Sequence, residues 1–174
     1  LRPDLVVEPL RGNINTRLER LHGGDFDAVV LAAAGLNRIG RSGEIAEILP
    51  ADTCIPAVGQ GALAVECRAD DDELLEFLSG YHHERTWAEV TGERTFLAVL
   101  DGGCQVPIGA HAARLADGRT LRLTGFVGTP DGSTLLRETM EGTDPEALGQ
   151  ALGEALLSRG AGEILLNAKE GTDA

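Results

Sequence analysis

Two turn signals, each lying between stretches of strand character, constrain the fold of this chain more than any other feature. Residues 116–118 read Ala-Asp-Gly and residues 130–132 read Pro-Asp-Gly, and such combinations favour tight turns. Strand patterns flank these turns over residues 109–115, 120–127 and 135–140. The middle pattern places alternate residues on one face, namely Leu121, Leu123, Gly125 and Val127. The sequence therefore predicts a three-stranded antiparallel sheet.

Helical patterns precede and follow this predicted sheet. The first runs from about Glu84 to Leu100, directly after His82-His83. Its predicted apolar face, which Arg94 interrupts, consists of Trp87, Val90, Leu97 and Leu100. In the second pattern Asp144 suits an N-cap and Pro145 a first helical residue, and the pattern ends at Gly160. With a last short helix over residues 162–168, these elements predict an α+β domain covered by helices.

The N-terminal residues follow the order of a parallel α/β unit. A strand is predicted over residues 5–7, and Asn13 or Asn15 can cap a helix that ends near Leu21. A second strand is predicted over residues 26–31, and the small residues after it continue into a second helix. The fold class that we expect is thus an α/β part followed by an α+β domain.

The stretch between these parts is predicted to pass from one domain to another. Residues 54–67 are extended and apolar, with a break at Gly59-Gln60-Gly61. Cys67 alternates with Leu63 and Val65, which predicts a core cysteine. Acidic residues 70–73 favour the start of a helix that carries Leu74, Leu75, Phe77 and Leu78. A metal site built from these carboxylates is a weaker interpretation than a solvated helix start.

Charge and cysteine content exclude several classes of function. The chain has 174 residues and a formal net charge of −13, so nucleic acid is not expected as a partner. No apolar run reaches the length of a membrane span, and no signal peptide is visible. Three cysteines without a C-x-x-C spacing predict neither a disulfide framework nor a zinc site and fit a reducing cytoplasm. The first residue is not Met, which suggests a fragment or a processed product.

Arginines gather around one predicted crevice of the α/β part. Arg11 follows the first predicted strand, Arg17 lies on the next helix, and Arg38 on the helix after the second strand. Anions bind where the carboxyl ends of parallel strands meet helix N-termini. Three guanidinium groups there, in an acidic chain, predict a site for carboxylate or phosphate.

Cys104 stands in the segment Gly102-Gly103-Cys104-Gln105-Val106-Pro107-Ile108-Gly109, between the long helix and the sheet. Two preceding glycines leave the thiol uncrowded, and Pro107 stiffens the exit from the loop. A lone cysteine is more often a small buried residue, but these flanks favour a presented thiol. The histidines at 82, 83 and 111 match no zinc spacing with it, so a helix-start role is favoured for the first two.

Five segments resemble the hydroxymethylbilane synthase (porphobilinogen deaminase) family, in the order of that family. They are RGNINTRL, FDAVVLAAAGLNRIG, PAVGQGALAVECR, HHERTWAEVTGERTFL and GGCQVPIGA. The resemblance covers nearly the whole chain and implies a three-domain protein whose first two domains are lobes like those of periplasmic binding proteins. It implies that residues 1–57 are the second half of domain 2, 58–61 a hinge, 62–80 a segment returning to domain 1, and 84–174 domain 3.

The resemblance also implies a cofactor and a reaction. Cys104 matches the position that carries a dipyrromethane through a thioether, and Arg11, Arg17 and Arg38 match arginines that bind its carboxylates and those of the substrate. Further residues implied to line the cleft are Leu31, Ala32 and Gln60. The implied reaction joins four porphobilinogen units head to tail, with release of ammonia, in tetrapyrrole (haem) biosynthesis.

Several expectations follow from the part of the family that this chain does not match. The family's catalytic aspartate lies in an N-terminal half outside this sequence, so no catalytic residue is assigned and the chain alone is expected to be inactive. Porphobilinogen is the expected small-molecule partner, without membrane or nucleic acid, and the full-length protein is expected to be a cytoplasmic monomer. Two rival interpretations remain: a non-enzymatic anion-binding α/β module, and a thiol enzyme with Cys104 as nucleophile.

Overall fold

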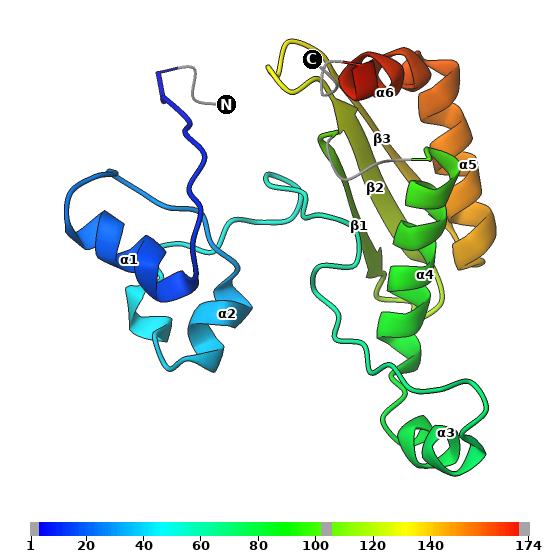
Figure 1. The fold of residues 1–174 in the computed structure, drawn as a ribbon. Helices are drawn as coiled ribbons and strands as arrows, with labels where there is room; N and C mark the ends of the chain where they lie inside the picture. Colours follow the sequence, from blue (N-terminus) through cyan, green and yellow to red (C-terminus); the bar gives the residue numbers. More distant parts are fainter. Residues whose placement is uncertain (1–3, 102–105, 171–174) are drawn as a thin grey trace. The chain divides into compact units, whose positions relative to one another are not determined.

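The computed structural model describes residues 4–101 and 106–170 and divides the chain into two compact units (Figure 1). We call Leu1–Leu49 the N-terminal unit and Pro50–Ala174 the C-terminal unit. No helix in the described ranges has the length and apolar character needed to cross a membrane.

Two α-helices and a short 3-10 helix make up the regular structure described in the N-terminal unit: α1 (Ile14–His22), α2 (Ala33–Arg38) and η1 (Ser42–Glu44). The Asn13 side chain caps α1 by accepting a hydrogen bond from the N–H of Thr16 at 3.0 Å, as the sequence predicted. The two α-helices approach closely, because a Cβ on Gly35 would lie 2.8 Å from the Cδ1 of Ile14. Leu18 and Leu36 are buried in this unit.

The strands predicted over residues 5–7 and 26–31 are wrong: neither stretch is a strand in the structure. Val6 and Val7 are 86% and 90% exposed. A strand is stabilised by hydrogen bonds to a neighbouring strand and by packing of one face. Among the described residues of this unit no such neighbour is present, so β-branched composition alone does not produce the parallel α/β order.

The stretch before the C-terminal helices contains one helix, α3 (Asp72–Ser79). Asp71 caps it by accepting from the N–H of Leu74 at 3.2 Å, which confirms the predicted acidic helix start. The strand predicted through residues 62–67 is not formed, and Leu63 is 84% exposed. Cys67 is a partly exposed free thiol outside the described hydrophobic core, so its prediction as a core cysteine is wrong.

The predicted sheet is confirmed. Strands β1 (Ile108–Arg114), β2 (Leu121–Gly128) and β3 (Leu135–Gly142) pair antiparallel in chain order. The register aligns Ala112 with Leu123 and Leu123 with Met140. Both predicted turns contain a glycine in the left-handed region, with φ of +70° at Gly118 and +72° at Gly132.

Helices α4 (Glu84–Val99), α5 (Pro145–Ser158) and α6 (Ala161–Glu170) pack on one face of this sheet (Figure 1). Asp144 caps α5 by accepting from the N–H of Ala147 at 2.9 Å, and Pro145 is its first residue, as predicted. The largest fully buried side chains of this unit are Phe96, Leu121, Leu123, Val127, Leu152 and Leu156. The alternation predicted for β2 is therefore the core face of the domain.

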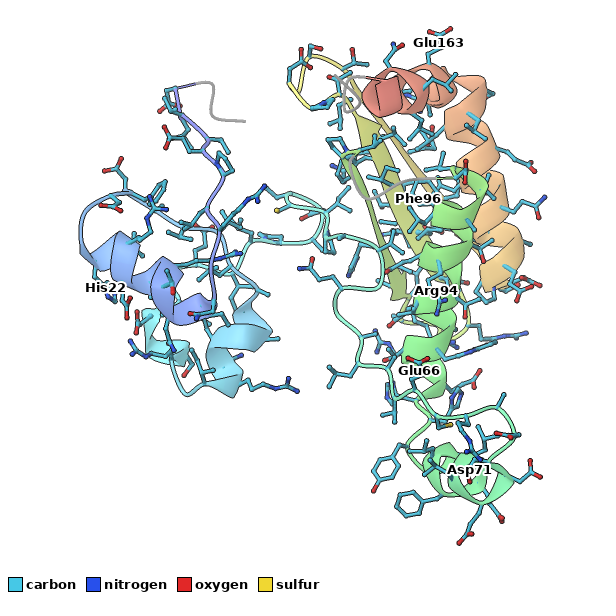
Figure 2. All side chains as sticks on the ribbon, viewed as in Figure 1. His22, Glu66, Asp71, Arg94, Phe96 and Glu163 are labelled. Atoms are coloured by element: carbon cyan, nitrogen blue, oxygen red, sulfur yellow. The ribbon has the colours of Figure 1, made fainter. Side chains whose placement is uncertain are left out.

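The predicted apolar face of α4 is partly wrong. Trp87 is 51% exposed, whereas Leu100, directly after the helix, is buried as predicted. The buried positions within α4 are Ala88, Gly92, Glu93 and Phe96. Phe96 lies on the side of α4 that faces the sheet (Figure 2). The small residues Ala88 and Gly92 let α4 approach its neighbours closely, so the buried face is set by size as much as by hydropathy. Arg94 is exposed and therefore lies off this face.

Candidate cofactor and substrate site

Arg17, on α1, is the predicted anion ligand with the best-defined surroundings. Its Nε donates to the carbonyl of Gly12 at 2.8 Å, which holds the side chain back toward the start of the helix. Gly12 has a φ of +119°, and a Cβ there would meet the Thr16 side chain. The turn that precedes α1 therefore favours glycine and supplies the acceptor that orients the guanidinium group.

Arg11 and Arg38 are exposed, one just before the cap of α1 and the other at the end of α2. Two neighbouring arginines behave differently: Arg20 pairs with Asp25 at 2.9 Å and Arg41 with Glu44 at 2.6 Å. Within residues 4–101 and 106–170, no ion pair engages the three arginines predicted to bind anions. Their charges are thus not neutralised by the acidic side chains described.

Glu44 contacts two other basic side chains of this unit, Arg41 and His22. Arg41 donates to its Oε1, and the Nε2 of His22 lies 3.1 Å from its Oε2. The hydrogen bond from Arg41 is the main cause of the lowered pKa of Glu44; burial opposes it, and the charges of Arg41 and His22 add to the lowering. Among the described residues, Glu44 therefore pairs with Arg41 and His22 and not with Arg11, Arg17 or Arg38.

Leu31 and Ala32 lie at the start of α2. Leu31 is half-buried, and Ala32 is exposed and occupies the cap position without a side-chain hydrogen bond. The structure thus places Arg11, Arg17, Leu31, Ala32 and Arg38 in one compact unit, on or beside two helices that touch through Gly35. Gln60 belongs to the C-terminal unit, so the structure groups five of the seven predicted residues.

Gln60 lies in a tight turn. Its backbone N–H donates to the carbonyl of Ala57 at 3.1 Å, and its side chain is exposed. Gly59, directly before it, has a φ of +68°, a conformation that favours glycine. The predicted break at Gly59-Gln60-Gly61 is therefore a real turn rather than an interruption in a strand.

Glu93 holds this turn and was missed by the sequence analysis. Its side chain is buried at 7% exposure on the core face of α4. One oxygen, Oε2, accepts from the N–H of Gly59 at 2.8 Å, and the other, Oε1, accepts from the N–H of Ala112 at 2.9 Å. One signal in the sequence could have indicated this buried position: Glu93 lies three residues before Phe96 and therefore on the same side of the helix.

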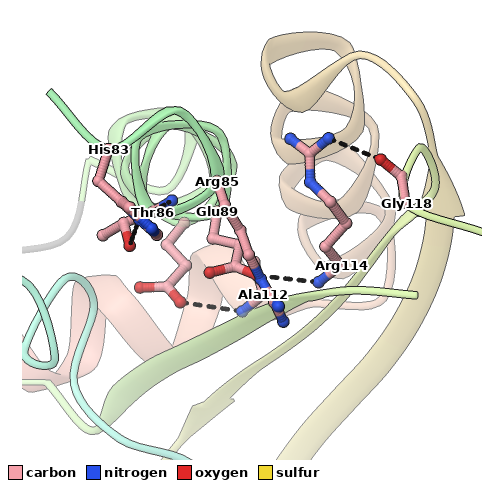
Figure 3. Close-up of polar contacts among 8 residues, drawn as sticks. His83, Arg85, Thr86, Glu89, Ala112, Arg114 and Gly118 are labelled. Carbon is pink, nitrogen blue, oxygen red and sulfur yellow. Dashed lines mark hydrogen bonds and ion pairs between the residues drawn. The ribbon is translucent and has the colours of Figure 1, made fainter. Parts of the chain in front are cut away.

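The edge of β1 is closed by α4 and by the segment before it. The N–H of Ala110 donates to the carbonyl of Pro56 at 3.1 Å, that of Ala112 to Glu93, and that of Arg114 to Glu89 at 2.9 Å. Figure 3 shows the bonds from Ala112 and Arg114 running toward α4. Alternate amides of an otherwise open strand edge are thus satisfied, which protects the edge from further pairing.

The histidines serve the start of α4, as expected. His83 is the N-cap residue, and its Nδ1 accepts from the N–H of Thr86 at 3.3 Å and bonds the Thr86 hydroxyl at 2.7 Å (Figure 3). His82 lies 3.2 Å from a carboxylate oxygen of Glu84. In the part of the chain that the structure describes, no three potential metal ligands gather.

Cys104, the predicted tether, lies outside the described residues. The chain enters the core again directly afterwards, because Val106 is buried in the hydrophobic cluster. Gly109 lies against the carbonyl of Pro56 and the ring of Phe126, and a Cβ there would be 2.7 Å from that carbonyl oxygen. The described chain after Cys104 thus continues into β1, which contacts Pro56, directly before the turn of Gln60.

Comparison with known proteins identifies the family. Residues 1–76 match a family model described as the dipyromethane cofactor binding domain of porphobilinogen deaminase. Residues 87–158 match a second model, described as the C-terminal domain of porphobilinogen deaminase. The chain belongs to the porphobilinogen deaminase family, which confirms the resemblance seen in its five segments. All predicted cofactor ligands except Cys104 lie within the first match, and Cys104 lies within the second.

Curated relatives agree along nearly the whole chain. Porphobilinogen deaminase from Brevibacillus brevis is 52% identical over 164 residues, which cover 94% of this chain and 53% of the relative. The protein of the same name from Halalkalibacterium halodurans is 52% identical over 174 residues, covering 99% and 56%. That from Oceanobacillus iheyensis is 50% identical over 173 residues, covering 99% and 55%. The chain spans about half the length of the curated relatives it matches.

Proposed function

We propose that this chain is the C-terminal part of a porphobilinogen deaminase, which joins four porphobilinogen units head to tail, with release of ammonia, in tetrapyrrole biosynthesis. One observation carries the proposal: relatives of that name are 50–52% identical over 94–99% of the chain. Identity at this level extends through both structural units rather than through one shared motif. The catalytic carboxylate is assigned to the part of the family outside this sequence.

In this proposal Arg11, Arg17 and Arg38 bind the carboxylates of cofactor and substrate. Each pyrrole unit carries two carboxylates, and guanidinium groups bind such groups through paired hydrogen bonds. The support from the structure is the absence of ion pairs to these three arginines among the described residues, in a chain of net charge −13. Arg17 is also held in place by the Gly12 carbonyl, which lowers the entropy cost of binding.

The residues present fit a covalently held dipyrromethane. Such a cofactor requires a thiol for the thioether and cations for its carboxylates, and both kinds of group occur in the matched regions. The bound cofactor would serve as the primer to which new units are added. Cys104 would hold it, the three arginines would neutralise it, and Leu31, Ala32 and Gln60 would line its cleft. We propose no catalytic role for these residues.

The domain assignment belongs to the same proposal. Residues 1–57 would complete domain 2, which resembles a periplasmic-binding-protein lobe, and residues 58–61 would be the hinge. Residues 62–80 would return to domain 1, and residues 84–174 would form domain 3. The exposed apolar side chains of residues 62–80 support this, because a segment that completes another sheet would be uncovered when that sheet is absent. A cytoplasmic monomer fits the free thiols of Cys54 and Cys67.

The test is a chimera in which this chain replaces the matching part of the Brevibacillus brevis relative. The chimera should carry one dipyrromethane by intact mass and consume porphobilinogen, whereas Cys104→Ser should lose both properties. Cys54→Ser, which removes an exposed free thiol, is the matched control and should retain both. An adduct that persists in Cys104→Ser would refute the tether. A folded chimera that binds carboxylates but never acquires the cofactor would favour the anion-binding module.

A further inference from the structure

Glu93 is the buried charged side chain of the described residues, and the family resemblance assigns it no role. It lies on α4 four residues after Glu89, beside Phe96 and against β1. A buried carboxylate is costly unless hydrogen bonds satisfy it. Glu93 must therefore be explained by its partners.

Both partners of Glu93 are backbone amides from distant segments. Gly59 lies 34 residues before it in the chain, and Ala112 lies 19 residues after it. The bonds measure 2.8 and 2.9 Å and use different carboxylate oxygens. One side chain thus joins the turn before the helix to the first strand after it. Hydrogen bonds to a charged acceptor are about twice as strong as those between neutral groups.

The turn meets the C-terminal unit through further close contacts. Val58 packs against the hydrophobic core, and a Cβ on Gly59 would lie 3.8 Å from the Cγ1 of Val90. The carbonyl of Pro56 accepts from the N–H of Ala110. Backbone and apolar contacts therefore dock residues 56–59, while Glu93 provides the side-chain hydrogen bond that reaches the turn at Gly59.

We propose that Glu93 is a positioning residue that fixes the turn 57–60, and with it Gln60, on the C-terminal unit. Gly59 directly precedes Gln60, whose own N–H closes the turn on Ala57. Holding the Gly59 amide therefore restricts the backbone from which the Gln60 side chain projects. The expected effect on turnover rests on the proposed function, in which Gln60 lines the cleft. The docking of the turn on the C-terminal unit is independent of that function.

A carboxylate suits this position because it offers an acceptor on each side. In Glu93→Gln one oxygen would become an amide NH2, which cannot accept from a backbone N–H. One of the two amides would lose its partner, while the volume of the side chain would be kept. Glu89→Gln is the matched control. Glu89 also lies on α4 and its Oε1 accepts from the N–H of Arg114, but no contact joins it to residues 56–60 in the described structure.

Amide hydrogen exchange tests the docking directly. In the unsubstituted chain the Gly59 amide should be protected, whereas the Gly61 amide should exchange freely. In Glu93→Gln the amide that faces the new NH2 group, Gly59 or Ala112, should exchange about tenfold faster or more, as loss of a hydrogen bond to a charged group predicts. In Glu93→Met, which removes both acceptor oxygens, Gly59 and Gln60 should both accelerate. Exchange of the Phe96 and Leu123 amides should stay unchanged. Glu89→Gln keeps one oxygen that can accept from the Arg114 N–H, so exchange at Arg114 and at residues 57–60 should stay unchanged.

Two results would overturn the proposal. The first is an unprotected Gly59 amide in the unsubstituted chain, a measurement that needs no variant to fold. The second is equal acceleration at residues 57–60 in Glu93→Met and Glu89→Gln. In the chimera, Glu93→Met should lower kcat about tenfold, a modest misplacement effect, whereas Glu89→Gln should leave kcat unchanged. An inactive parent chimera would refute the proposed function and leave the exchange result standing.

Discussion

Gly125 of β2 lies directly beneath the ring of Phe96 on α4. A Cβ on this glycine would lie 2.6 Å from the Cζ of Phe96, and the ring is fully buried. The strand thus presents no side chain where the helix presents its largest fully buried one. This complementarity sets how closely α4 packs on the sheet.

Gly125→Ala should destabilise the chain by about 1–3 kcal/mol, because the added methyl group would overpack a filled site. Chemical denaturation would measure the change. Phe96→Leu in the Gly125→Ala background should recover part of the loss, since leucine leaves room for the methyl group. Additive effects of the two substitutions would show that this contact does not control the packing.

The contact between α4 and α5 depends on a second glycine. A Cβ on Gly149 would collide with the Gly92 carbonyl and lie 2.8 Å from the Cβ of Thr95. Gly149→Ala should therefore cost about 1–3 kcal/mol, although alanine is the better helix former. Gly162→Ala on α6 is the control, because its nearest neighbour would be the Leu157 Cδ2 at 3.9 Å. That substitution should be neutral or stabilising by up to about 1 kcal/mol. Equal effects in thermal unfolding would contradict the packing argument.

Local signals in the sequence predicted helix caps and turns well in both units. Asp144 and Asn13 act as helix caps, and Gly118 and Gly132 make turns, because each depends on groups a few residues away. The strand over residues 26–31 failed since a strand needs a partner that composition cannot supply. Glu93 was missed because its partners Gly59 and Ala112 are distant in the chain. The crevice of Arg11, Arg17 and Arg38 was predicted at the ends of strands that the structure does not contain, so the family motifs are the remaining sequence argument for these arginines.

The free energy of unfolding should depend on pH through one aspartate in each hairpin turn. The hydroxyl of Thr120 donates to Asp117 at 2.6 Å and two backbone N–H groups add to it, which together lower the pKa of Asp117 from 3.8 to about 2. Bonds from Thr129 and then Ser133 lower the pKa of Asp131 likewise to about 2. A lowered pKa in the folded chain stabilises it above the unfolded pKa, and this contribution is lost as pH falls through the folded value.

Asp117→Asn should therefore reduce the free energy of unfolding at neutral pH, and the difference from the unsubstituted chain should shrink between pH 3.8 and about 2. Urea denaturation at a series of pH values would measure it. Asp131→Asn should behave in the same way, and the two effects should add because the turns are separate. Parallel pH profiles for parent and variants would show that the turn carboxylates do not contribute.

Exposed apolar side chains on and before α3 should make the isolated chain self-associate. Leu63 is 84% and Phe77 64% exposed, and neither belongs to the described hydrophobic core. Uncovered surface of this kind promotes association. Sedimentation velocity should show association that rises with concentration and that Leu63→Ser with Phe77→Ser reduces. Leu166→Ser, which changes a similarly exposed leucine on α6, should leave it unchanged.

The chimera with the Brevibacillus brevis relative separates two explanations of that association. If residues 62–80 complete a domain built mainly from the missing half, the chimera should cover Leu63 and Phe77 and remain monomeric. In that case Phe77→Ser should destabilise the chimera by about 2–4 kcal/mol, as loss of a buried aromatic side chain predicts, although it improves the behaviour of the isolated chain. An effect of Phe77→Ser that is favourable in the isolated chain and unfavourable in the chimera would show that residues 62–80 pack against the N-terminal half. A chimera that still associates through Phe77 would show that the surface is not covered by that half.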